Sequence, residues 1–313
     1  MNTYPPLRIS PENSPMLLQG SHAGLKDDIQ ELRLPIGPCL NELYVLSMHR
    51  QAYLGRKLAD ESNSLWSRLS PATLLGPLHK TRFSEGVIRL QHGTLAPSEK
   101  SELFFQATSA SGATIHFPFP VMDSTGSEQI APLPFWQDTE RLAEALDHQE
   151  QHFRQHSLAL LKHRLKPGDV IYDPACSTGT FIAHLARGMP AMHCIGSDIC
   201  PAMIEHARNR HPLDNLHFAA MDAASSCLAA TGCDVLILRF LNAEVMPRQQ
   251  AIDLFHHLAR LVRRGGLLIL FGHTPVLFPV ELEAQRLGLS VVGCLAQCPE
   301  TQALFQFFIL ERA

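Results

Sequence analysis

Three aspartates stand at positions that suit the binding of a nucleoside. Asp173 ends an apolar stretch, Asp198 follows 25 residues later at the end of a second one, and Asp222 ends a third. A carboxylate at the second position can accept both hydroxyls of a ribose, and one at the third can accept from an adenine amino group. Each also has a plainer interpretation, because aspartate caps helices and stabilises turns. The three in chain order favour a ligand over three separate turns.

The segment that follows Asp173 is built from small residues. Ala175, Ser177 and Gly179 would let the backbone pass close to a ligand, and Gly179 begins a predicted helix whose N-terminal N–H groups favour a carboxylate. A plain tight turn explains the same residues equally well. The Cβ of Ser177 disfavours a positive φ. We therefore expect either an ordinary φ with the hydroxyl facing the ligand, or a differently seated ligand.

Three side chains are candidates for catalysis at the same edge of the predicted sheet. Tyr172 precedes Asp173, Asn242 follows the fourth predicted strand with Glu244 close by, and His273 follows the fifth. His273 is a candidate general base. Core packing for Tyr172 and loop polarity for Asn242 and Glu244 are the competing interpretations.

The histidines at 148, 152 and 156 share one helix face at four-residue spacing. This face could bind a metal or supply general bases that face the cofactor, or it could simply be a polar helix face. No accompanying carboxylate motif supports a metal, so we predict no metal site.

The second half of the chain alternates short apolar strands with helices, which predicts a parallel sheet covered on both faces. The expected strands are 169–173, 193–198, 216–221, 234–240 and 267–272, the expected helices are 180–188, 201–210, 248–263 and 279–287, and strands 289–296 and 303–311 close the chain. The short connection between the last two strands requires an antiparallel hairpin. The sequence Arg263-Arg264-Gly265-Gly266 is typical of a helix end with a glycine stop.

The first half differs, since residues 1–140 hold 13 of the 22 prolines. We expect irregular chain over 1–35, a helix over 38–60, strands over 86–92 and 101–108, a hairpin turning at 111–112, and one long helix over 138–165. This pattern divides the chain into a cover domain (1–137), a connecting helix (138–166) and a sheet domain (167–313).

Composition limits the partners. The chain of 313 residues has 26 basic and 30 acidic residues, a net charge of −4, and eight cysteines without a CxxC pair. It lacks the basic excess that nucleic-acid binding needs, an apolar run of about 18 residues that would span a membrane, and a signal peptide. We expect a cytoplasmic protein with a small-molecule substrate, no nucleic-acid or membrane partner, and a homodimer as one open assembly.

Residues 167–313 resemble the class I S-adenosyl-L-methionine (SAM)-dependent methyltransferases. The resemblance rests on VIYDPACSTGTF (170–181), GSD (196–198), AAMDA (219–223), CDVLILRFLNAEVM (233–246), LVRRGGLLILF (261–271) and LFQFFILER (304–312). It implies an α/β fold, a Rossmann-like, seven-stranded, mostly parallel sheet with a C-terminal antiparallel hairpin, to which residues 1–137 add a mixed α+β cover domain.

The resemblance also implies SAM as cofactor and assigns its contacts. The methionine end would lie against the first loop, the ribose on Asp198, the adenine near Asp222, and the sulfonium above the residues after the fourth strand. The implied cofactor-binding residues are Asp173, Ala175, Cys176, Ser177, Gly179, Asp198, Ile199, Met203, Asp222, Ala223, Arg239 and Phe240.

Two departures from the family's sequence pattern limit the reactions that we expect. The family usually has glycine where Ser177 stands. Adenine-specific DNA methyltransferases share the DPAC start but carry an Asn/Asp-Pro-Pro-aromatic motif where this chain has residues 239–242 without proline. The sequence thus favours methylation of a small molecule in biosynthesis.

Two alternatives stay open. In one, the amino group of SAM displaces its own sulfonium, which forms azetidine-2-carboxylate and releases methylthioadenosine. In the other, the protein binds SAM without turnover. Phe135 and Trp136 either cap the sulfonium by cation–π contact or pack as ordinary core or hinge residues.

Overall fold

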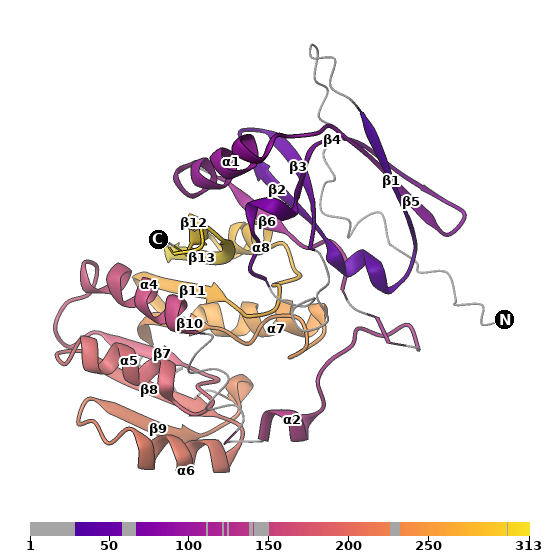
Figure 1. The fold of residues 1–313 in the computed structure, drawn as a ribbon. Helices are drawn as coiled ribbons and strands as arrows, with labels where there is room; N and C mark the ends of the chain where they lie inside the picture. Colours follow the sequence, from indigo (N-terminus) through magenta and orange to yellow (C-terminus); the bar gives the residue numbers. More distant parts are fainter. Residues whose placement is uncertain are drawn as a thin grey trace.

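A computed structural model describes residues 29–57, 67–110, 112–120, 122–123, 125–137, 140, 150–225, 232–298 and 300–313. Its larger sheet has seven strands in the order β12-β13-β11-β10-β7-β8-β9 (Figure 1). The strands are β7 (Val170–Asp173), β8 (His193–Asp198), β9 (Leu216–Ala220), β10 (Cys233–Leu238), β11 (Val262–Phe271), β12 (Leu289–Gln297) and β13 (Leu304–Arg312). β7 to β11 are parallel, and β13 runs antiparallel to both β11 and β12. The mixed α/β fold class is confirmed.

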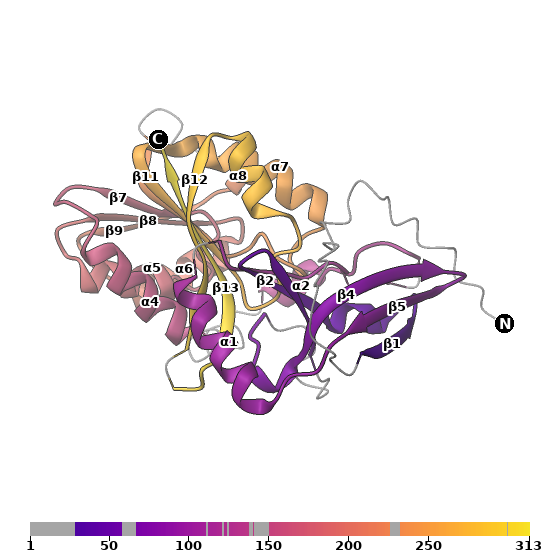
Figure 2. The same cartoon turned by 90° about the horizontal axis from the view of Figure 1, so that it is seen from above.

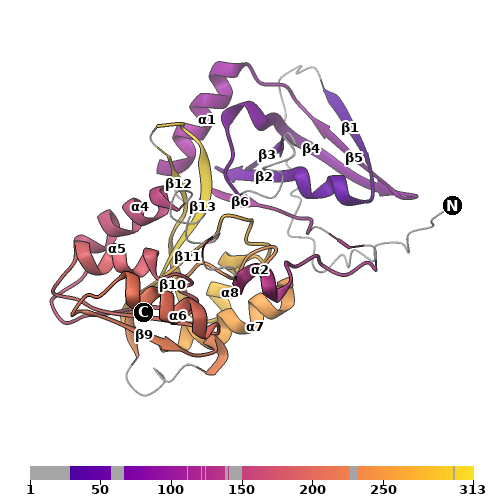
Figure 3. The same ribbon diagram turned by 60° about the horizontal axis from the view of Figure 1, so that its bottom comes forward.

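Both faces of this sheet are apolar, which is why helices cover both. Successive strand residues point to opposite faces. Ile237 and Ile269 therefore pack with α4 (Gln151–Lys162), α5 (Thr180–Gly188) and α6 (Pro201–Arg210). Leu236 and Leu268 pack with α7 (Arg248–Leu258) and α8 (Val280–Arg286). Figure 3 shows α4 and α5 on one side of β10 and β11, and α7 and α8 on the other.

The N-terminal part forms a second, antiparallel sheet of six strands in the order β1-β5-β4-β3-β2-β6. Its strands are β1 (Gln30–Pro35), β2 (Leu43–Met48), β3 (Gln51–Arg56), β4 (Leu74–Ser84), β5 (Val87–His92) and β6 (Thr114–His116). The helix α1 (Pro97–Ser109) packs Phe104 and Ala107 on it. Figure 2 shows the two sheets on opposite sides of the molecule, with α1 beside the β12–β13 edge of the larger sheet.

Three predictions in this half were wrong. Residues 30–35, which belong to the stretch expected to be irregular, form the strand β1. The helix expected over 38–60 is a short 3-10 turn (Pro38–Glu42) followed by the β2–β3 hairpin. Its two-residue loop, His49 and Arg50, has φ of 52° and 64°, the conformation of a tight hairpin turn. The strand expected over 101–108 lies within the helix α1, and residue 111 of the expected hairpin turn lies outside the described residues.

Three other boundaries moved. The helix expected over 248–263 ends at Leu258, and after a 3-10 turn (Ala259–Leu261) the residues 263–266 belong to β11. The expected glycine stop was therefore wrong: the helix ends before the arginine pair. Of the helix expected over 138–165, α4 covers Gln151–Lys162, while residues 138–139 and 141–149 lie outside the described residues.

Candidate functional site

The loop after β7 is tied to the end of β8 by backbone hydrogen bonds. The Ser177 N–H donates to one oxygen of Asp198 at 2.9 Å, and the Cys200 N–H donates to the other at 2.9 Å. Each carboxylate oxygen can accept more than one hydrogen bond, so Asp198 keeps acceptor capacity for two ribose hydroxyls. The carboxylate thus both caps the start of α6 and remains suited to a ligand.

The conformation of Ser177 differs from one of the two expectations. Its φ is 51°, so the loop does not run at ordinary φ there, and its Oγ lies 3.9 Å from the Met203 sulfur. A serine in this left-handed region is uncommon. The expected ordinary φ was therefore wrong, and the alternative, a methionine end seated differently, stays a prediction about the ligand.

The residues assigned to the nucleoside lie at the ends of β8 and β9. Ile199 is 63% exposed beside Asp198, whereas Met203 is buried. Asp222 is exposed and accepts a hydrogen bond from the Ala224 N–H at 2.9 Å, as a turn aspartate does. Ala223, next in the chain, is buried.

A buried ion cluster occupies the position expected for the methionine end. Nε of Arg239 donates to Asp173 at 3.2 Å, Nη1 donates to Glu150, and Nη2 donates to the Cys176 carbonyl at 2.9 Å. The side chains of Arg239, Glu150 and Asp173 are 6%, 5% and 0% exposed. Nε2 of His273 lies 3.4 Å from Glu150. The cluster joins the ends of three strands to the residue that precedes α4.

One guanidinium cannot fully compensate two buried carboxylates, and their pKa values separate. Burial raises the pKa of Glu150, but the charge of Arg239 and the hydrogen bond from His273 outweigh burial and lower this pKa to about 2. Burial raises the pKa of Asp173 to about 6 against the opposing charge of Arg239, and the nearby charge of Glu150 adds to the increase. Of the two carboxyl groups, Asp173 is therefore the one that can exchange a proton near neutral pH.

Besides His273, the candidate catalytic residues are Tyr172 and Asn242, which lie in different surroundings. Tyr172 is fully buried with its hydroxyl 2.8 Å from Ser197 Oγ. Asn242 is buried, its amide donates to Thr274 Oγ1 at 2.6 Å, and its Oδ1 has no hydrogen-bond partner among the described residues. A buried acceptor without a donor is rare. Its environment fits a ligand that brings a donor, such as an amino group.

The remaining assigned residues pack at the edges of the loop. Phe240 packs partly buried against the α7–α8 side of the sheet. Burial raises the pKa of the Cys176 thiol, so this cysteine is no nucleophile near neutral pH. Gly179 has φ of 77°, and a Cβ there would lie 2.7 Å from the Phe218 ring. Only glycine fits this approach of loop and β9.

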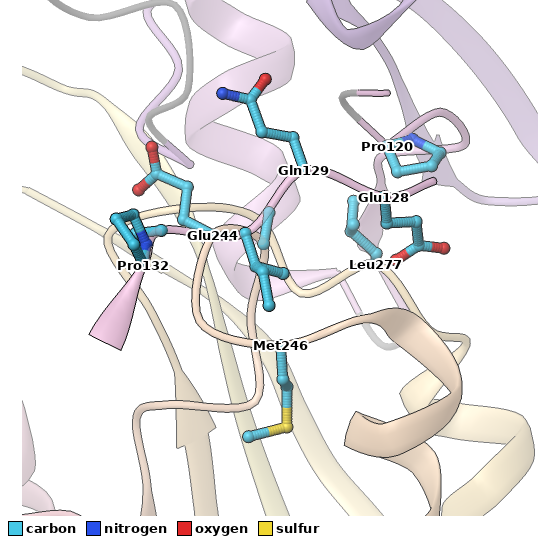
Figure 4. A pocket seen from close by; sticks show the side chains of 10 residues that line it. Pro120, Glu128, Gln129, Pro132, Glu244, Met246 and Leu277 are labelled. Atoms are coloured by element: carbon cyan, nitrogen blue, oxygen red, sulfur yellow. The ribbon is translucent and has the colours of Figure 1, made fainter. Parts of the chain in front are cut away.

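A cavity of about 200 Å³ lies between the N-terminal part and the loop after β10 (Figure 4). It is lined by Pro120, Glu128, Gln129, Ile130, Ala131, Pro132, Ala243, Glu244, Met246 and Leu277. Glu244 has φ of 70°, and burial raises its pKa against the charges of His273 and Lys57. Burial lowers the pKa of Lys57 to about 8.

The α4 histidines pack rather than converge. His152 and His156 each contact a phenylalanine ring of β13 edge-on, at 4.8 Å and 4.7 Å, and His148 lies outside the described residues. Within the described ranges no group of three His, Cys, Asp or Glu side chains is arranged to hold a metal. No helix among the described residues is long and apolar enough to cross a membrane.

Sequence reasoning missed Glu150 and Lys57. Glu150 lies 89 residues before Arg239, and no local pattern links the two. Only the packing of α4 on the sheet brings them together.

Comparison with known proteins finds a matching family model and two relatives. A methyltransferase-domain family model matches residues 171–266. Isonocardicin synthase of Nocardia uniformis subsp. tsuyamanensis is 33% identical over 239 residues, which are 76% of this chain and 77% of that protein. Carboxy-S-adenosyl-L-methionine synthase of Desulfotalea psychrophila is 30% identical over 122 residues, 37% of this chain and 49% of that protein.

Among solved structures, the sugar N-methyltransferase KedS8 from Streptoalloteichus is 14% identical and covers 56% of this chain and 93% of its own, with a TM-score of 0.45. The relation to isonocardicin synthase spans both halves of this chain, because 239 residues exceed the sheet domain alone. Together with the matching family model and the strand-end carboxylates, this shows that the chain belongs to the class I SAM-dependent methyltransferase family.

Proposed function

We propose that this SAM-dependent transferase acts on a small molecule held between the sheet domain (167–313) and the N-terminal cover (1–137). The observation that carries the proposal is the cavity that residues from both parts line. One lining residue, Glu244, lies close enough to His273 for the charge of His273 to lower its pKa. Asp198 and Asp222 would hold the ribose and adenine, and the loop 175–179 with Arg239 would border the methionine end. SAM supplies an electrophilic carbon on a sulfonium, and the protein's task is to hold a nucleophile in line with it.

The first candidate reaction is methylation. The acceptor would enter the cavity beside Glu244, whose carboxylate can orient a hydroxyl or amino group. His273 and Asn242 lie at the same edge of the sheet. A base is needed only where the acceptor must lose a proton before attack, and Glu244 and His273 are the two groups placed for it. Tyr172, buried against Ser197, would support the loop.

The second candidate is displacement at the aminobutyryl chain instead of the methyl group. The nitrogen of SAM's α-amino group would attack the carbon bonded to sulfur. The C–S bond would break with its electron pair left on sulfur. The products would be azetidine-2-carboxylate and methylthioadenosine, with one proton released.

Two observations favour this second candidate. The amino group attacks only after losing a proton, and Asp173, with a pKa near 6 at the expected methionine end, can accept it. Both curated relatives are named synthases, and the name of one states that its product is a SAM derivative.

The nucleoside product decides between the two. The purified protein would be incubated with SAM alone, then with SAM and candidate acceptors, and the products identified by mass spectrometry. Methylthioadenosine and azetidine-2-carboxylate without an acceptor support the second candidate. S-adenosylhomocysteine formed only with an acceptor supports the first. SAM binding without any nucleoside product under either condition would contradict both and leave a binding protein.

A further inference from the structure

A strap formed by residues 117–120, 122–123 and 125–137 crosses the ligand edge of the large sheet. One end is pinned to the loop after β10: the Ala131 N–H donates to the Glu244 carbonyl at 2.7 Å, and the Arg248 N–H donates to Glu128 at 2.7 Å. Figure 1 shows the strap descending from the N-terminal sheet and ending in α2 (Leu133–Gln137) beside α6. The strap therefore reaches from the end of β10 to the end of β8.

The far end of the strap is held by one indole ring. Trp136 packs against two buried residues at the start of α6, its N-cap Cys200 and Met203 of its first turn. Its ring meets Phe135 edge-on at 4.8 Å. Cys200 is also the residue whose N–H binds Asp198 at 2.9 Å. The indole therefore contacts a residue that stands only two positions after Asp198, the carboxylate assigned to the ribose.

The indole N–H is buried and has no acceptor among the described residues. Indole nitrogen is a donor only, and a buried donor without an acceptor is destabilising because it has lost its hydrogen bond to water. Tryptophan N–H groups that are buried usually find a partner. The part of the site nearest to the indole is the one assigned to the ribose of SAM, whose oxygen atoms can accept a hydrogen bond.

We propose that Trp136 is a SAM-contact residue: its ring closes over the nucleoside part of the cofactor and its Nε1–H donates to an oxygen of it. The strap anchor at Glu244 and the indole on α6 lie on either side of the strand ends that carry Asp173 and Asp198, so the nucleoside would lie beneath the strap. This assignment rests on the proposed function. It replaces the expected cap over the sulfonium, because the ring lies at α6 rather than beside Arg239.

The test uses tryptophan fluorescence. The sequence has only two tryptophans, Trp66 and Trp136, so Trp66→Phe leaves Trp136 as the sole emitter. Titration of this variant with S-adenosylhomocysteine should change the emission along the same saturation curve as calorimetry. Trp136→Phe, which keeps a ring and loses the N–H, should weaken binding about 3- to 10-fold, the effect of one net hydrogen bond. Trp136→Ala should weaken it further, by about 30-fold or more.

The matched control is Phe83→Leu, an exposed aromatic on β4 of the N-terminal sheet, which should leave affinity unchanged. Thermal unfolding of each variant identifies any loss of fold, and a Trp136→Phe variant with unchanged melting and weakened binding supports the contact. Normal binding by the wild type with silent Trp136 emission and unchanged Trp136→Phe affinity overturns this assignment alone. A folded wild type that binds neither SAM nor S-adenosylhomocysteine overturns the proposed function as well.

Discussion

Arg239 is the residue on which the candidate site is organised. Its guanidinium reaches a strand-end aspartate, a loop carbonyl and Glu150 at once, and it lies 5.5 Å from the Phe181 ring centroid in a cation–π contact. A buried charge is tolerated only when it is paired and hydrogen-bonded. This cluster therefore fixes the loop before any ligand arrives.

Replacing Asp198 by Ala should weaken SAM binding about tenfold or more. A hydrogen bond to a charged group contributes roughly 1.5–3 kcal/mol, and each 1.4 kcal/mol is about tenfold in affinity. The variant also loses the acceptor for Ser177 and Cys200, so melting temperature serves as the control. Calorimetry that finds unchanged affinity would refute the ribose assignment.

The raised pKa of Asp173 predicts a pH dependence of stability. The folded state holds the proton up to about pH 6, whereas the unfolded chain releases it near 3.8. Asp173 therefore stabilises the fold below its unfolded pKa, and this contribution is lost as pH rises through about 6. The free energy of unfolding of the wild type relative to Asp173→Asn should fall by on the order of 2 kcal/mol between about pH 4 and pH 7. Urea denaturation at several pH values measures it, and a constant difference would contradict the assignment.

Among the helices and strands, the local sequence pattern predicted correctly those of the sheet that is buried on both faces. It failed where a turn is formed by residues that rarely form such turns. The helix Thr180–Gly188 begins and ends as predicted. The β2–β3 hairpin was missed because its turn residues are His49 and Arg50 rather than the asparagine-glycine that signals such turns. For α1, the proline at its first position and Glu99, which accepts from the Ala96 N–H at 2.6 Å, were the available signals.

Gly179→Ala should destabilise the fold by about 2 kcal/mol or more. The left-handed backbone alone costs an L-residue about 1–2 kcal/mol, and the new Cβ would overlap the Phe218 ring and the Ala207 Cβ at 2.7 Å and 2.9 Å. Gly86→Ala is the matched control, since its φ of 79° is similar and nothing lies within 4 Å. Equal losses in chemical denaturation would mean that close packing of the loop contributes nothing.

In the whole molecule, the two sheets are in direct contact and are not joined only by a linker. Leu69 and Leu304 exchange backbone hydrogen bonds of 2.8 Å and 2.9 Å, and Leu304 belongs to the hydrophobic cluster of the N-terminal sheet. The buried amide of Gln306 on β13 donates to the carbonyls of Ile115 and Val276 at 2.9 Å and 3.2 Å. The described parts should therefore unfold together.

Gln306→Leu should lower the free energy of unfolding by about 2–4 kcal/mol, because it leaves the buried backbone groups of Ile115 and Val276 without partners. Gln297→Leu on neighbouring β12 is the control, since that amide makes one exposed hydrogen bond, and it should change stability by less than about 0.5 kcal/mol. Differential calorimetry measures both. Two separate transitions in the wild type would contradict the shared core.

The sequence by itself determined the parallel sheet domain, the family resemblance and the strand-end aspartates, because buried strands and the loops that follow them are encoded by local pattern. The packing of distant elements was needed to show that Glu150 pairs with Arg239, that His273 and Lys57 lie near Glu244, and that Trp136 packs against α6. These residues are far apart in the chain and meet through packing of elements, which local propensity does not specify. The same reason explains why most of the antiparallel N-terminal sheet was missed, although its strand at 86–92 was expected: its pairings join residues as far apart as Val45 and His116.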